Sequence, residues 1–126
     1  MPGPRCYLIH ALAPAGSTPR EANDRLNEYV ADERRGLAVW HDHFLGAHGG
    51  AVVLELRTEE ERALLDDPGP LAGWRLTIHP LMYALTAVGF DALTAFTLER
   101  YRSVDLAELA AAEPDDPRYW WRRLPS

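Results

Sequence analysis

The sequence predicts an α+β fold, in which four strands form one sheet and two helices pack on one of its faces. Two segments begin with helix-capping sequences, and four stretches have the alternating or β-branched character of strands. Along the chain these segments follow the order strand, helix, strand, strand, helix, strand, with a C-terminal extension. This split βαβ order leaves the second face of the sheet open.

The two helices have the clearest start signals. The run from Thr18 to Glu21 combines an N-cap, a proline at the first helical position and a capping box, which predicts a helix over 19–35 that stops before Gly36. A second capping box starts at Thr58 and predicts a helix to about Asp67. Residues at helical spacing form the expected buried stripe of the first helix: Ala22, Leu26, Tyr29 and Val30.

The strands are expected on both sides of these helices. Their ranges are Arg5–Leu12, Leu37–Leu45, Ala51–Arg57 and Trp74–Leu85. A glycine-rich turn, Gly46–Gly50, joins the middle two into a hairpin. Proline donates no backbone hydrogen bond, so the last strand is either an edge at Pro80 or breaks there.

The C-terminal part allows two interpretations. Residues 91–101 fit a helical period with Asp91 as the cap, but they also alternate like a fifth strand, and we favour the helix. The range 105–113 predicts a further short helix. We expect one ferredoxin-like domain over 1–101, with 102–126 as its extension. The aromatic run Tyr119-Trp120-Trp121 packs on its own domain or dimer partner, or recruits another protein.

Composition excludes several classes of function. The net charge of −6 disfavours binding to a nucleic-acid backbone or to an anionic membrane surface. The chain has no lysine, which excludes a lysine Schiff base and a P-loop lysine. Cys6 is the single cysteine. The apolar run Cys6–Pro14 is too short for a signal peptide and is interrupted by His10, and the weakly charged run Leu81–Phe96 is too short for a membrane span. We expect a cytoplasmic, soluble protein.

The order of elements, the 37–57 hairpin and the Trp74–Tyr83 strand resemble the dimeric α/β-barrel superfamily over about residues 5–88. This superfamily includes antibiotic-biosynthesis-monooxygenase-like and stress-responsive barrel proteins. The resemblance implies a homodimer in which two open sheet faces form a barrel around a small organic ligand. It also implies, for an enzyme, oxygenase or isomerase chemistry without a cofactor. No family motif transfers to individual residues.

Histidine is the residue type that gathers in the expected strands, and three hypotheses follow. In the first, His79, His10, Arg75 and Tyr83 line a pocket in the barrel, with Trp40 and His41 as further ligand contacts. A neutral histidine, here His79 or His10, serves as a general base near pH 7, and Arg75 holds an anionic oxygen.

In the second hypothesis, His41 and His43 bind a transition metal, because i, i+2 spacing puts both rings on one strand face. Asp42 points to the other face and no third ligand is close in sequence, so we expect no metal there. In the third hypothesis the histidines are structural residues of a dimer interface, and the protein is non-catalytic. Alternation alone does not decide which face of 37–45 turns inward.

Overall fold

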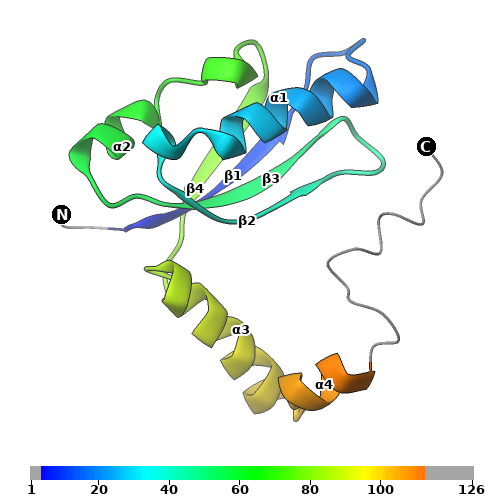
Figure 1. Cartoon of the computed structure of the whole chain (residues 1–126), viewed down its shortest axis with the longest axis vertical. Helices are drawn as coiled ribbons and strands as arrows, with labels where there is room; N and C mark the ends of the chain where they lie inside the picture. Colours follow the sequence, from blue (N-terminus) through cyan, green and yellow to red (C-terminus); the bar gives the residue numbers. More distant parts are fainter. Residues whose placement is uncertain (1–3, 113–126) are drawn as a thin grey trace. The chain divides into compact units, whose positions relative to one another are not determined.

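The computed structural model describes residues 4–112, so the aromatic run at 119–121 lies outside the described part of the chain. Four antiparallel strands form one sheet in the order β2-β3-β1-β4 (Figure 1). The strands are β1 (Cys6–Leu12), β2 (Leu37–His43), β3 (Gly49–Glu55) and β4 (Arg75–Pro80). The α+β class is therefore confirmed, and the strand order is compatible with a ferredoxin-like fold.

Two helices cover one face of this sheet, α1 (Pro19–Ala31) and α2 (Glu59–Leu64) (Figure 1). The capping box of α1 is present, because Thr18 Oγ1 accepts from Glu21 N at 3.1 Å and Glu21 Oε2 accepts from Thr18 N at 3.3 Å. The expected end of this helix at residue 35 is wrong. Asp32 leaves the helical conformation and its side chain caps a separate 3-10 turn, Glu33–Arg35.

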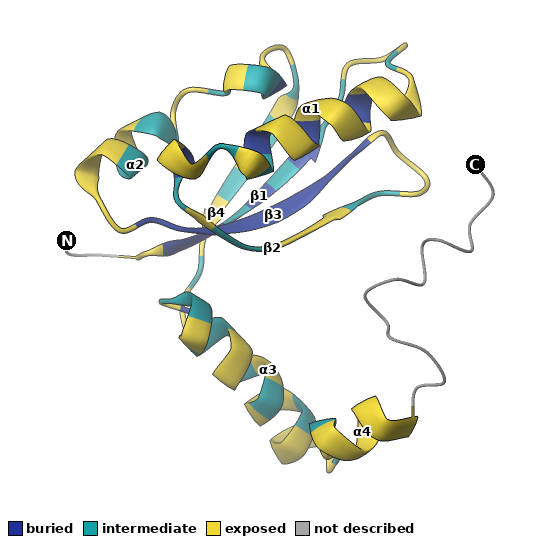
Figure 2. Cartoon of the chain, in the orientation of Figure 1, coloured by how far each residue is buried: buried dark blue, intermediate teal, exposed yellow. Residues whose placement is uncertain are grey.

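The core lies between the sheet and these helices. It is built from alternate residues of β1 and β3 and from the inner stripe of α1, while β3 is buried along its whole length (Figure 2). Its members are Tyr7, Ile9, Ala11, Leu26, Tyr29, Val52, Leu54, Leu56 and Leu71. Leu76 and Ile78 of β4, and Trp74 just before this strand, pack against the core, as alternation predicts.

Three strands are shorter than expected, β1 by a single residue, and β3 begins and ends two residues earlier. β4 ends at Pro80 rather than Leu85, and just beyond it Leu81 N still donates to Cys6 O at 2.9 Å. β4 is an edge strand, which is where a sheet tolerates proline. β2 ends at His43. β3 begins at Gly49, where φ is +144° and a Cβ atom would lie 2.1 Å from the backbone oxygen of Ala11, so only glycine fits this position.

A β-bulge in β2 corrects the expected division of this strand into two faces. The pairing register shifts between Ala38 and Trp40, and Val39 is the extra residue. An extra residue reverses the faces beyond it. Strict alternation would place His41 on the same face as Leu37. Because of the bulge, His41 instead shares a face with Ala38, and Trp40 shares a face with Leu37.

Two further helices follow β4, namely α3 (Ala87–Arg102) and α4 (Leu106–Ala112). The helix is therefore confirmed over 91–101 and a fifth strand there is wrong, but the helix begins at Ala87, so Asp91 is not its cap. The chain divides into two compact units between Phe90 and Asp91, inside α3. Among residues 4–112, no helix combines the length and the hydrophobicity that a membrane span needs.

The carboxylate of Asp32 makes the free energy of unfolding decrease at low pH. It accepts from the backbone of Arg34 at 3.2 Å and from the Arg34 guanidinium twice at 2.9 Å, and Arg35 Nε lies 3.4 Å away. Hydrogen bonds from Arg34 lower the pKa of Asp32 from 3.8 to about 2. Because the pKa of Asp32 is lower in the folded chain than in the unfolded chain, its ionised carboxylate stabilises the fold above pH 3.8. This stabilisation is lost as the pH falls towards about 2.

We expect Asp32→Asn to remove this part of the acid dependence. Urea unfolding from pH 5 to pH 2 will show a wild-type advantage that shrinks across the window from about 4 to about 2. Arg34 is largely exposed, so solvent screening holds the advantage to about 1 kcal/mol or less. A difference that is constant across this pH range contradicts the assignment.

Candidate functional site

The open face of the sheet is defined by the pairing register. Tyr7, Ile9 and Ala11 of β1 belong to the core below the helices, so the alternate residues of this strand point to the other side. Directly paired residues of antiparallel strands share a face. The open face therefore carries one row of Trp40, Val53, Leu8 and His79, and a second row of Asp42, Ala51, His10 and Thr77.

Apolar and aromatic groups form the floor of this face. Trp40 is 44% exposed on the edge strand, and Val53 and Leu8 follow it in the same row. The rings of His10 and Phe44 pack at a centroid distance of 5.2 Å. A flat apolar molecule would find a stacking surface here.

Polar groups lie along the opposite edge of the same face. Arg75 and His79 are exposed on β4, where Arg75 is paired with Leu12 and His79 with Leu8. His10 is paired with Thr77, so the expected approach of His10 to His79 is a diagonal one, of about 7 Å between the backbones. The face thus offers one guanidinium and two imidazoles beside an apolar floor.

Four of the six residues expected in the site share this face: His79, His10, Arg75 and Trp40. Tyr83 does not belong to it as a strand residue, because β4 has already ended, and its side chain is 74% exposed. His41 lies on the helix side of β2, one residue after Trp40.

Asp42 and Thr77 also lie on the open face, and the candidate site identified from sequence omits both. They occupy the row of His10, on either side of it. The alternation of Trp40, Asp42 and Phe44 indicates that Asp42 shares a face with Trp40. To place Asp42 in the site, one would also need to know which face of β2 turns away from the helices. The Asp42 carboxylate is 2.8 Å from the backbone N of His43, which fixes its position.

The helix side of β2 holds a second group of polar side chains. The His41 and His43 rings lie 5.5 Å apart, and His43 Nε2 is 3.1 Å from Asn27 Oδ1 on α1. Burial lowers the pKa of His43 below its usual value and His41 lowers it further, so this ring is neutral at pH 7. Within residues 4–112, no three His, Cys, Asp or Glu side chains gather as a metal site.

Cys6 is buried at the start of β1. Burial raises the pKa of its thiol, and the nearby Glu55 raises it further. A thiol with a raised pKa is a poor nucleophile, which agrees with a structural role for this residue.

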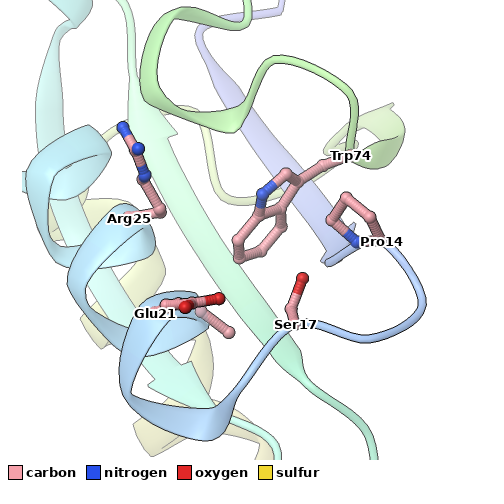
Figure 3. Close-up of a pocket in the computed structure, with 6 residues that line it drawn as sticks. Pro14, Ser17, Glu21, Arg25 and Trp74 are labelled. Atoms are coloured by element: carbon pink, nitrogen blue, oxygen red, sulfur yellow. The ribbon is translucent and has the colours of Figure 1, made fainter.

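A shallow hollow opens beside α1, and the candidate site predicted from sequence does not include it. It has a volume of about 160 Å³, and the Trp74 ring forms one wall (Figure 3). Its lining residues are Pro14, Ser17, Glu21, Ala22, Arg25 and Trp74. Glu21 is already engaged in the capping box, and its charge opposes that of Arg25, so the hollow has no marked preference for an anion or a cation.

Comparison with known proteins leaves the open face as the main guide to function. No protein family model matches the chain, and no curated protein or solved structure is significantly similar to it.

Proposed function

We propose that this protein is a homodimer that binds a small organic molecule on the open face of its sheet. The observation that carries the proposal is the common face of Trp40, His10, His79 and Arg75, in a sheet whose other face is filled by the core. Apolar surface with a few convergent polar groups is typical of small-molecule sites. A second copy of the chain, packed against this face, would enclose the ligand between the two sheets.

The residues of this face suit a flat ligand with an acidic oxygen. Trp40 supplies a stacking surface, and Arg75 supplies hydrogen-bond donors for a carboxylate, phenolate or enolate. His79 or His10 would accept a proton from the ligand, since a neutral imidazole can act as a general base. In an enzyme, these roles fit a cofactor-independent oxygenase or isomerase that begins by removing a proton.

The exposed apolar side chains of helices α3 and α4 also support self-association. None of the side chains of α3 and α4 is buried in the single chain, although Val88, Phe96, Tyr101 and Leu109 are large and apolar. On α3 the Phe96 and Tyr101 rings pack edge to face, with 5.7 Å between their centroids. An exposed aromatic pair of this kind is apolar surface that a second copy of the chain would cover.

A non-catalytic dimer is the alternative function, and one observation favours it. The packing of the His10 ring against Phe44 is the contact expected of a structural histidine. In that case the open face would be filled by side chains of the partner subunit, and no ligand would enter.

His79→Ala separates the two functions. We expect the substitution to weaken binding of anilinonaphthalene sulfonate, an aromatic anion used as the probe, at least tenfold, or about 1.4 kcal/mol. The melting temperature will remain nearly unchanged because His79 is exposed on β4. Fluorescence titration and thermal denaturation measure the two effects.

Arg25→Ala is the control for this experiment, because Arg25 lines the hollow beside α1 and lies away from the open face. It should leave probe binding unchanged. A fall of several degrees in the melting temperature of His79→Ala, with probe affinity retained, would contradict the ligand site and favour the structural dimer.

A further inference from the structure

We propose that His41 and His43 form a labile site for one divalent transition ion of the Zn²⁺, Ni²⁺ and Cu²⁺ class. The site lies on the helix side of β2 and is independent of the ligand site on the open face. The two residues are two positions apart in the regular part of β2 after the bulge at Val39, so they share a face at the edge of the sheet.

The separation of the two rings fits a shared ion. Their centroids lie 5.5 Å apart. Two imidazoles on one tetrahedral ion, with metal–nitrogen bonds of about 2.0 Å, place their centroids about 5 Å apart. A small rotation of His41 closes the difference, and His41 is exposed on an edge strand, so this rotation disturbs no core contact.

Asn27 determines which nitrogen of His43 is the ligand. His43 Nε2 lies 3.1 Å from the amide oxygen of Asn27, and in the tautomer in which Nε2 donates to this oxygen the lone pair lies on Nδ1. Nδ1 is buried and has no hydrogen-bond partner among the side chains and backbone that the structure describes. A hydrogen bond on one ring nitrogen that orients the other nitrogen as a ligand is the usual arrangement of metal-binding histidines.

The ligand chemistry selects the class of ion. Imidazole suits Zn²⁺, Ni²⁺ and Cu²⁺, whereas Mg²⁺ and Ca²⁺ require oxygen ligands. The sequence argument against a metal was the missing third ligand, since Asp42 lies on the other face. That argument excludes a closed structural site, but an exchangeable ion takes its remaining ligands from water.

Calorimetric titration of the tag-free full-length chain with Zn²⁺ tests the proposal. We expect one ion per chain, and at least tenfold weaker binding for His41→Ala and for His43→Ala. His48→Ala is the matched control, because His48 is an exposed histidine in the neighbouring turn, and it should bind Zn²⁺ like the wild type. Wild-type affinity in His41→Ala, or equal losses in all three variants, would overturn the site.

The ring nitrogens give a second readout that does not depend on a variant folding. Long-range ¹H–¹⁵N NMR spectra of the metal-free chain should show His43 protonated on Nε2, and Zn²⁺ should shift its Nδ1 resonance together with one nitrogen of His41. A metal-free His43 protonated on Nδ1, or a Zn²⁺ response confined to other histidines, would overturn the assignment.

Discussion

Arg35→Ala is expected to lower the free energy of unfolding by about 3 kcal/mol, or about 10 °C in melting temperature. Arg35 is 4% exposed, and its guanidinium donates to the backbone oxygens of Leu64, at 3.2 Å, and of Asp67. It also lies over the Tyr29 ring, 4.6 Å from the centroid. The substitution removes the guanidinium bond to both carbonyls, of which Leu64 O keeps its bond from Asp67 N, and it opens a void between α1 and the end of α2.

Urea unfolding of three variants checks this expectation. Arg20→Ala, an exposed arginine at the start of α1, is the control and should change stability by less than about 0.5 kcal/mol. Arg35→Lys should fall between the other two variants, since an ammonium group keeps the charge but not the planar, forked donors. Equal stability of Arg35→Ala and Arg20→Ala would show that the buried guanidinium does not hold these segments together.

Trp40→Asp is expected to weaken the proposed homodimer at least 100-fold, or about 2.7 kcal/mol. Trp40 is a large aromatic residue in the apolar row of the open face, and a central tryptophan commonly dominates an interface. A carboxylate in its place would be buried on association without a partner charge, and it would repel Asp42 on the same face. The single chain should remain folded, because Trp40 is 44% exposed within it.

His41→Asp is the matched control for the dimer. It introduces the same charge one residue further along β2, on the opposite face of the sheet. Light scattering at micromolar concentration in the presence of a chelator should give twice the 14.1 kDa chain mass for the wild type and for His41→Asp, and a monomer for Trp40→Asp. A monomeric wild type, or a dimeric Trp40→Asp, would contradict the use of the open face as the interface.

The sequence by itself determined the elements that depend on local chemistry. The capping box at Thr18 and the N-cap at Thr58 place the starts of α1 and α2, because their hydrogen bonds join residues three positions apart. The second box is incomplete, since the Glu61 carboxylate accepts from Arg57 N. Pro80 also indicates that β4 is an edge strand, because the missing N–H is a property of the residue itself. Alternation also identifies Leu76 and Ile78 as the inner side of β4.

Only the tertiary structure decided which polar residues come together. The bulge at Val39 depends on how β2 pairs with β3, and it moves His41 to the side opposite Trp40. The burial of Arg35 depends on carbonyl groups about thirty residues further along the chain. Capping and alternation are encoded within a few residues, whereas strand register and the partners of a buried charge are set by contacts between segments that the fold alone brings together.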